Sequence, residues 1–519
     1  MNAVRLFDAH ERRAPGALAL RWDTGTMTYG ELGVRARRAA AVLAARGVRA
    51  EERVALLLPN DPAFAVALLA TYWLGATAVV LSPAWQPADA ARALADADAR
   101  VLVTTQAAAA ALGAELPETL LVDVASGARS FDAAIASAGD TGPLEPAPRR
   151  AGDAAVILFS SGTTGDPKGV VLSHGNLVFN AESKARYCGL TASDSLALVL
   201  PVAHCFGQNA VLLAALTAGA SVRLYPRFDE DRLRAGIVAG EVSVLFAAPV
   251  VFQRLLDAGD PAVLGALRCS LSAAAPMSVT LARRWREATG LPLLQGYGLT
   301  ESSPFAAFDD ATSDQPGCVG RAIEGVEIRI GEIDGDGWMK PGELGEIAIR
   351  GPNVMREYWR RPEQTRRALR GGWLRSGDVG RLSPQGHLTL TDRLDDAINV
   401  AGFKVYPSDV ERAVTAHPAV AEAAAYRVRH GARGWRVAVD VVLAPGMTLD
   451  AAGLHAFAEE RLAGFQRPSL VRFVSGLPRS PSGKVLRRVL TASVHTVDEA
   501  DGLHADARLA RVEQPAPRT

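Results

Sequence analysis

Short apolar runs alternate with helix-periodic segments from residue 1 to about residue 222. The runs VALLLP, AVVLSP, VLVTT and LLVDV are short and lack the polar alternation of a strand with one solvated face. Such runs are typical of parallel strands that helices cover on both faces. The alanine-rich residues 107–111 follow helical spacing, and alanine is the best helix former. The pattern therefore predicts an α/β fold with βαβ rhythm.

The pattern changes near residue 325. The segment EGVEIRIGEIDGDGWMKPGELGEIAIRGP alternates around Gly, Asp and Pro turns, which predicts a hairpin-rich β subdomain. The later segment GHLTLTDRLDDAINVAGFKVYP also alternates, and a helix-like stretch, more strands and a helix follow it to about residue 490. We predict a large N-terminal domain over residues 1–394, a small α+β domain over 395–495 and a loosely ordered polar tail over 496–519.

Two long uncharged stretches, residues 62–88 and 195–222, raise the question of a membrane span. Gly75 and two prolines divide the first into a helix-like half and a β-branched half. The second contains Pro201 and polar side chains such as His204. Helix breakers and polar groups are costly in lipid but suit a buried helix followed by a buried strand. We therefore expect no membrane span.

Charge and cysteine usage narrow the class of protein. The chain has 519 residues, and its 56 basic and 56 acidic side chains give a formal net charge of zero. Without a sustained Lys or Arg run, it lacks the electrostatic footprint of a nucleic-acid-binding protein. Its 4 cysteines are widely spaced, which favours neither a zinc site nor a disulfide framework. Charged residues also interrupt the N-terminal segment too early for a secretory signal, so we expect a cytoplasmic protein.

One loop rich in Ser, Thr and Gly stands out, in the string FSSGTTGDPKGVVLSH at Phe159–His174. Such a loop exposes backbone N–H groups and hydroxyls in a concave arrangement that binds phosphate. The GxxxxGK[ST] spacing is absent, so this is not a Walker A loop. Composition alone favours a flexible glycine hairpin. Only the complete string indicates a phosphate-binding loop.

The string SSGTTGDPKG closely resembles the phosphate-binding signature of the ANL adenylate-forming superfamily, which comprises acyl- and aryl-CoA synthetases, peptide-synthetase adenylation domains and luciferases. Further strings resemble other motifs of that family, in family order, between about residues 10 and 490. They are QGYGLTES at Gln295–Ser302, GELGEIAIRGPNVMREYW at Gly342–Trp359, WLRSGDVGRL at Trp373–Leu382, the segment Asp392–Glu411 and LPRSPSGKVLRR at Leu477–Arg488.

The resemblance implies an acid–thiol ligase that forms an acyl-adenylate from ATP with Mg²⁺. The acyl group then passes to CoA or to the phosphopantetheine of a carrier protein. In such a transfer, charge neutralisation and positioning supply most of the catalysis, so the site needs cations and a metal rather than a nucleophile.

Individual roles follow from the matching positions. Glu301 matches the glutamate that holds the metal, and a hard carboxylate oxygen suits Mg²⁺; Thr164 is a second candidate ligand. Lys484 matches the lysine that contacts the carboxylate and the α-phosphate during adenylation. With His204, these residues form our catalytic set. The nucleotide-binding set is Ser160, Ser161, Gly162, Thr163, Thr164, Gly165, Lys168, Ala274, Ala275, Pro276, Gly296, Tyr297, Gly298, Thr300, Asp378, Arg393 and Lys484.

The resemblance also implies a moving C-terminal domain. Asp378 and Arg393 match residues that contact ribose or phosphate, although an interdomain ion pair is an alternative for Arg393. Asp395 has the hinge position, where rotation would bring in either Lys484 for adenylation or the strand at Gly402 for thioester formation. Gly402 lacks a Cβ atom, which fits the wall of a narrow pantetheine tunnel.

The string SAAAP at Ser272–Pro276, together with Gly296–Gly298, resembles the adenine cradle of the family, and we call these the adenine segments. The acyl pocket is expected around PVAHCFG at Pro201–Gly207 and at the edges of the adenine segments. His204 has the position of an aromatic or histidine gate in related enzymes, and a buried structural histidine is the alternative. The stretch CFGQNA contains no Asp for an α-amine and no Arg or Lys for a second carboxylate, which disfavours amino acids and malonate-like acids. The predicted lining is His204, Cys205, Phe206, Gly207, Gln208, Val250, Ala273 and Gly298.

A hydrophobic monocarboxylate remains as the acid. The strings PVAHCFGQ and GYGLTESSP look most like medium- and long-chain fatty acyl-CoA synthetases, which implies fatty acid metabolism. Gln208 is less typical of those enzymes, and bulky cyclic or aromatic acids stay open. We expect a monomer or a homodimer.

Three alternatives stay open for the acceptor of the acyl group. It is free CoA, it is a carrier protein supplied in trans, or there is no acceptor and the reaction stops at the adenylate, as in acyl-AMP ligases. The absence of an obvious insertion before the hinge favours full thioester formation. Five arginines are candidates for the CoA 3′-phosphate: Arg433, Arg436, Arg461, Arg467 and Arg472. A catalytically inactive binding protein with the same fold is disfavoured, since the matching residues are all present: Glu301, Asp378, Arg393 and Lys484.

Overall fold

The computed structural model describes residues 1–113, 115–139, 145–160, 168–309, 317–333, 335–400, 403–430, 434–479 and 485–494. Two compact units divide the chain. The first comprises Met1–Ser376 and Gly380–Leu390, and the second comprises Gly377–Val379 and most of the chain from Thr391 onward. Each unit has its own hydrophobic core.

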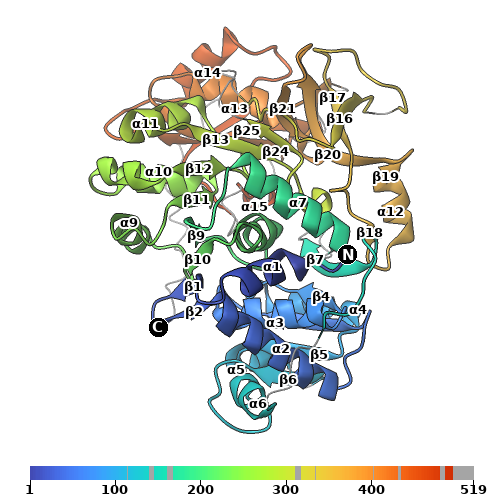
Figure 1. The fold of residues 1–519 in the computed structure, drawn as a ribbon. Coiled ribbons are helices and arrows are strands. Elements are labelled where there is room, and N and C mark those ends of the chain that lie inside the picture. The colour runs from blue at the N-terminus through green and yellow to red at the C-terminus, as the bar shows by residue number, and fades with distance from the viewer. Residues whose placement is uncertain are drawn as a thin grey trace. The chain divides into compact units, whose positions relative to one another are not determined.

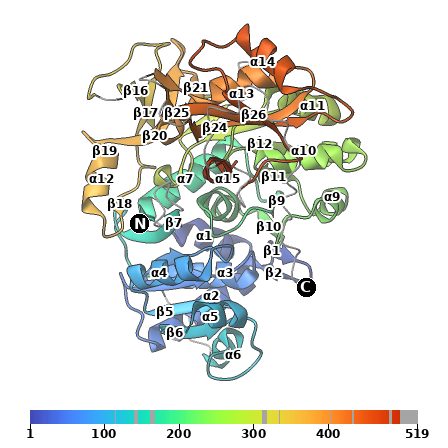
Figure 2. The same ribbon diagram turned by 180° about the vertical axis from the view of Figure 1, so that it is seen from behind.

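A nine-stranded sheet in the first unit carries the predicted acyl and adenine segments. Its order is β15-β14-β13-β12-β11-β9-β10-β1-β2, and the neighbours from β13 to β1 are parallel. Helices α9 (Glu230–Val238), α10 (Pro249–Asp257) and α11 (Val279–Thr289) lie along one side of it in Figures 1 and 2. The strands are β1 (Leu18–Trp22), β2 (Gly25–Thr28), β9 (Ser195–Leu198), β10 (Ser221–Leu224), β11 (Val244–Ala247), β12 (Cys269–Ser272), β13 (Leu293–Tyr297), β14 (Ala307–Asp309) and β15 (Arg321–Ala322).

A second sheet contains the four apolar runs of the N-terminal pattern. Its order is β18-β8-β7-β4-β3-β5-β6, and β7, β4, β3, β5 and β6 run parallel. The predicted βαβ rhythm and the alanine-rich helix are thereby confirmed. The strands are β3 (Arg53–Leu57), β4 (Thr77–Val80), β5 (Val101–Thr104), β6 (Glu118–Leu121), β7 (Ala154–Ser160), β8 (Lys168–Ser173) and β18 (Glu357–Tyr358).

Helices of the first unit connect these strands. Helix α2 begins with a capping box in which the Thr28 and Glu31 side chains bond each other's backbone N–H groups. The remaining helical elements are α1 (Arg5–Arg13), α2 (Tyr29–Ala45), α3 (Pro62–Trp73), α4 (Pro87–Ala97), α5 (Gln106–Leu112), α6 (Phe131–Ser137), α7 (His174–Tyr187), η1 (Phe206–Leu213), α8 (Ala214–Ala218), η2 (Pro261–Ala266), η3 (Thr300–Ser302) and α12 (Pro362–Ala368).

The hairpin-rich β region is also confirmed. Strands β16 and β17 pair in antiparallel register from Glu327 with Arg350 to Gly331 with Glu346, as the alternating pattern predicts. They belong to a sheet of order β16-β17-β20-β19, in which β21 also pairs β20. The strands are β16 (Glu327–Gly331), β17 (Gly345–Arg350), β19 (Leu369–Arg370), β20 (Trp373–Leu382) and β21 (Leu388–Arg393).

The second unit is the small α+β structure expected from the pattern. Strand β25 pairs antiparallel with β24 and parallel with β26, and a separate hairpin joins β22 to β23. Buried Val439 and Val441 on β25 pack with Val410 and Leu454 from two helices. The elements are η4 (Leu394–Asp396), β22 (Ile398–Val400), β23 (Phe403–Val405), α13 (Pro407–Thr415), β24 (Val420–Arg429), β25 (Trp435–Leu443), α14 (Ala451–Glu459), β26 (Leu470–Phe473) and α15 (Arg487–Ser493).

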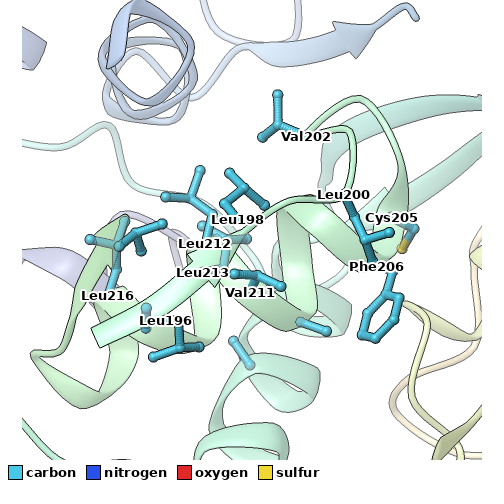
Figure 3. Close-up of a cluster of buried hydrophobic side chains, with 14 of the residues drawn as sticks. Leu196, Leu198, Leu200, Val202, Cys205, Phe206, Val211, Leu212, Leu213 and Leu216 are labelled. Carbon is cyan, nitrogen blue, oxygen red and sulfur yellow. The ribbon is translucent and has the colours of Figure 1, made fainter. Parts of the chain in front are cut away.

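Both uncharged stretches belong to the first unit, where residues 62–81 and 195–222 are mostly buried and residues 82–88 are partly or fully exposed. The first forms α3 and then β4, as expected from its two halves. The second forms β9, the π-helix η1, α8 and β10, so a strand precedes the expected helix and strand. Figure 3 shows Leu196 and Leu198 of β9 beside Leu212 and Leu213 of η1. Across the described ranges, no helix is both long and apolar enough to span a bilayer.

We predict that stability falls in acid because of His174. Its ring is buried, its Nδ1 accepts from the Ala3 N–H at 3.0 Å, and burial lowers its pKa from 6.5 to about 4. The unfolded chain therefore binds an extra proton between these two pH values, so the stability present above pH 6.5 declines as pH falls toward 4. The urea midpoint at several pH values measures this.

His174→Gln is expected to flatten that pH dependence. His387→Gln, at a partly exposed histidine, is the matched control and should leave the slope unchanged. Parallel slopes for the wild type and His174→Gln would contradict the assignment.

Candidate active site

The predicted acyl and adenine segments all follow the carboxyl ends of parallel strands in one sheet. The segment with His204 follows β9, Val250 follows β11, Ala273 follows β12 and Gly298 follows β13. These strands are neighbours in the order β13-β12-β11-β9. In open α/β sheets, ligands bind outside the carboxyl ends of the strands. The structure therefore brings the two predicted segment groups to the same sheet edge.

The adenine segments have a constrained backbone. Ala274 has a φ of +70°, which is uncommon for a residue with a Cβ atom and is found where surrounding structure enforces it. A Cβ atom on Gly298 would lie 1.5 Å from the Pro304 carbonyl oxygen, so only glycine fits there. Tyr297 is buried at the end of β13. Ala275, Pro276 and Gly296 lie in the same two segments.

The loop after Glu301 is irregular, and buried side-chain amides satisfy its carbonyl groups. Unpaired buried carbonyls are costly, and a loop outside the sheet ladder needs other donors. Three fully buried asparagines supply them from Nδ2: Asn180 to Ser302 and Phe305 at 3.3 and 2.9 Å, Asn209 to Ser303 at 3.1 Å, and Asn353 to Phe305 at 3.0 Å. These bonds hold the loop that follows Thr300 and Glu301.

Tyr358 connects the candidate metal ligand to the end of the glycine-rich loop. Its Oη donates to Glu301 Oε1 at 2.8 Å, and the Lys168 Nζ lies 5.8 Å from the centroid of its ring. Strand β18 brings Tyr358 there by pairing it with Val170 on β8. Lys168 itself pairs with Ser160 across the β7–β8 hairpin. A cation and a carboxylate thus flank one phenol beside the hairpin.

Asn60 holds the segment that contains His204. This buried amide accepts from the Val202 N–H at 2.7 Å and donates to three carbonyl oxygens, at Leu198, Leu200 and Tyr225, at 3.1, 3.0 and 2.9 Å. The half-buried His204 accepts at Nδ1 from the Phe206 N–H at 3.2 Å. Sequence reasoning missed Asn60, Tyr358 and the three loop asparagines because nothing local marks a distant partner.

The predicted acyl-lining residues that follow His204 lie at the start of the π-helix η1, with Cys205 directly before it. Phe206, Gly207 and Gln208 are buried there, and π-helical turns are frequent at functional sites. Burial, with a smaller effect of the Glu301 carboxylate, holds the pKa of the Cys205 thiol well above its usual value. Burial therefore favours the neutral thiol of Cys205 over the thiolate.

Several predicted residues lie outside the described residues. These are Ser161, Gly162, Thr163, Thr164, Gly165, Gly402, Arg433, Lys484 and the tail over 496–519, and the Ser160 side chain is likewise not described. The hairpin that closes at Ser160 and Lys168 locates the two ends of the glycine-rich loop.

Within the second unit, Arg393 Nε lies 3.3 Å from Asp378 Oδ1. The two candidate ribose contacts are therefore paired with each other. Asp395 lies in the short helix η4 directly after them. Of the arginines considered for the CoA phosphate, Arg472 binds the buried Asp440 through two nitrogens, at 2.8 and 2.7 Å. Arg472 therefore already serves a structural ion pair.

Comparison with known families decides the assignment. A model described as AMP-binding enzyme matches residues 7–359, and one described as AMP-binding enzyme C-terminal domain matches residues 409–484. The chain belongs to the AMP-binding enzyme family. The resemblance to the ANL adenylate-forming superfamily and the predicted α/β fold with a small C-terminal part are confirmed.

Relatives of this AMP-binding enzyme align along nearly its whole length. Feruloyl-CoA synthase of Amycolatopsis sp is 34% identical over 485 residues, which cover 92% of this chain and 96% of that protein. A 3-[(3aS,4S,7aS)-7a-methyl-1,5-dioxo-octahydro-1H-inden-4-yl]propanoyl:CoA ligase of Rhodococcus jostii (strain RHA1) is 34% identical over 495 residues, covering 89% and 93%.

The fold also matches a solved structure, ATP-bound MatB from Rhodopseudomonas palustris. The TM-score is 0.87 at 32% identity, and the match covers 95% of this chain and 99% of that one. With the family models and the CoA ligases above, this establishes an AMP-forming acid–thiol ligase that works through an adenylate.

We predict that Asn60→Ala destabilises the enzyme by about 2–4 kcal/mol, because a buried N–H and three carbonyls lose their partner. Urea unfolding measures the loss. Gln385→Ala, at an exposed amide, is the control and should change stability by less than about 0.5 kcal/mol. An Asn60→Ala enzyme as stable as the control would contradict the bridging role.

We predict that Tyr358→Phe lowers kcat/KM for ATP by about three- to tenfold, because Glu301 loses a hydrogen bond to a charged group. The phenyl ring remains, so packing is retained. Initial rates at varied ATP and Mg²⁺ measure the effect, which excess Mg²⁺ should partly restore. Unchanged ATP kinetics would show that Tyr358 does not orient Glu301.

Proposed function

We propose that this enzyme is an acyl-CoA synthetase that activates a hydrophobic monocarboxylic acid with ATP and then forms its thioester with CoA. The observation that carries the proposal is the convergence of an uncharged acyl segment and the adenine segments at one sheet edge. The buried residues Phe206 to Gln208 present no carboxylate for an α-amine and no cation for a second carboxylate.

A ring-bearing acid is the better candidate within that class. The two relatives described above are named for feruloyl and for a fused-ring propanoyl group. Those names do not support the expectation of fatty acid metabolism, although a medium- or long-chain acid is still compatible with the apolar lining. We therefore propose that a bulky cyclic or aryl acid is the substrate, in preference to a fatty acid.

The catalytic roles remain proposals on matched positions. Lys484 is placed at the carboxylate and α-phosphate, Thr163 and Thr164 at the phosphates, and His204 beside the carboxylate. Asp378 and Arg393 would contact the ribose or a phosphate, and their ion pair would open to do so.

We place the domain boundary at residues 394–395 and the hinge at Asp395, with Gly402 lining the pantetheine path. Rotation at this hinge would exchange the groups that complete the site between the two half-reactions. The carboxyl-terminal part, residues 395–495, would then carry Lys484 in one state and Gly402 in the other.

Mg²⁺ fits the residues present, with Glu301 and Thr164 as its protein ligands. Among the described residues no group of three or more His, Cys, Asp or Glu could hold a metal. Mg²⁺ in nucleotide sites needs only one or two carboxylates, because phosphates and water complete its shell. When bound, the ion would neutralise phosphate charge.

Pyrophosphate release tests the proposal. The purified enzyme is incubated with ATP, Mg²⁺ and one acid from a panel of cyclic, aryl and fatty acids, with and without CoA. Repeated turnover that requires CoA, with ring-bearing acids favoured, is expected. Lys484→Ala should reduce adenylation by about 10²–10³-fold, because one charge contact in the transition state is lost, but spare thioester formation from supplied acyl-adenylate.

Other outcomes are equally informative. About one equivalent of pyrophosphate, unaffected by CoA, would indicate an acyl-AMP ligase or a ligase that loads a carrier protein in trans. Equal loss of both half-reactions in Lys484→Ala would contradict the role of the lysine. No release with any acid would reject the proposed substrate class.

A further inference from the structure

Arg487 is the centre of an ion-pair cluster in the second unit. Its guanidinium donates to both carboxylate oxygens of Glu411, at 2.8 and 3.0 Å, and to Asp396 Oδ2 at 3.2 Å. Its Nε donates to the Ala425 carbonyl oxygen at 3.1 Å. The same Glu411 carboxylate accepts from the Ala425 N–H at 2.8 Å. One side chain thus joins three elements: η4, α13 and β24.

The cluster is charged and largely enclosed. Burial raises the pKa of Glu411 and of the neighbouring Asp392, whose carboxylate accepts from the Ser408 N–H at 2.7 Å. Although burial disfavours the charge of Arg487, the surrounding carboxylates raise its pKa. Removing one member of such a cluster leaves the others uncompensated, which is strongly destabilising locally.

Arg487 also lies directly after the described residues on either side of the segment that contains Lys484, residues 478–479 and 485–486, which we call the loop base. Arg479 and Val485 form an antiparallel bridge, and the Leu486 N–H donates to the Pro478 carbonyl oxygen at 2.8 Å. Arg487 is the first residue of α15, immediately after this closure. The opposite end of the cluster, Asp396, belongs to η4, where the hinge is placed.

We infer that Arg487 is a positioning residue that couples the hinge turn η4 to the loop base. This inference rests on the proposed function for its catalytic consequence, but not for the coupling itself. The contact between Arg487 and Asp396 fixes the position of the turn η4 relative to the start of α15. Adenylation therefore depends on Arg487, although Arg487 does not touch the substrate.

The second unit contains a matched control. Arg472 is also paired with a buried carboxylate, that of Asp440, which it binds through two nitrogens and which in turn accepts from the Tyr426 hydroxyl at 2.8 Å. Arg472 reaches the far end of α15 at Ser493, 3.0 Å away, and none of these partners belongs to η4 or to the loop base. Arg472→Met therefore removes comparable charge and packing without severing the proposed coupling.

Hydrogen exchange and half-reaction kinetics test the inference on the full-length chain. In Arg487→Met, amide exchange should rise by about tenfold both at residues 394–397 and at residues 485–490, because both segments lose their shared anchor. Pyrophosphate formation should fall by up to about 10²-fold at nearly unchanged KM for ATP, as expected for a displaced catalytic group. Thioester formation from supplied acyl-adenylate should change by much less.

Milder variants keep the test valid if Arg487→Met folds poorly. Asp396→Asn weakens only the hinge contact and retains the Glu411 ion pair, and it should slow adenylation while leaving thermal stability nearly unchanged. Arg487→Lys keeps the charge and should restore part of the adenylation rate. A merely structural role predicts no such separation between rate and stability.

Two results would overturn the inference: exchange that rises at only one of the two segments, or the same loss of adenylation in Arg472→Met as in Arg487→Met. Exchange is measured without turnover, so it decides the coupling independently. Absence of pyrophosphate release by the wild type with every acid would count against the proposed function alone.

Discussion

The parallel arrangement of β9, β11, β12 and β13 is the constraint on which the candidate site depends. The carboxyl ends of parallel strands lie at the same edge of a sheet, so the segments that follow these strands lie close together there. The chain spacing between these segments is large, from residue 198 at the end of β9 to residue 297 at the end of β13. Segments that are far apart in the sequence therefore lie close together in space, and the acyl and adenine segments form one candidate site.

Segments that leave a sheet lose its backbone hydrogen bonds, and the enzyme replaces them with buried amides. Asn60 serves the segment before His204, while Asn180 and Asn353 serve the loop after Glu301. A side-chain amide can donate and accept at once, so one residue satisfies several backbone groups in an irregular loop. Irregular backbone in the candidate site can therefore be held in place without a regular ladder.

The second unit shows how similar ion pairs can have different consequences. Arg472 binds Asp440 through two nitrogens, whereas Arg487 reaches both carboxylate oxygens of Glu411 through its Nη2 alone, and the surroundings of the two arginines differ. Arg472 ties strands and a helix end within one core, whereas Arg487 joins a turn, a helix and a strand at the start of α15. What an ion pair does depends on which elements it connects more than on its own strength.

Hydrophobic spacing and motif strings in the sequence determined the α/β class, the β-rich region, the small α+β part and the family. These features are local, because strand and helix periodicity and short loop motifs depend on neighbouring residues. The tertiary structure alone decided that Tyr358 meets Glu301, that Asn60 bridges to Val202 and that Arg472 is paired with Asp440. The reason is physical: each of these contacts joins residues more than 30 positions apart in the chain, and such pairings depend on packing geometry that no local pattern encodes.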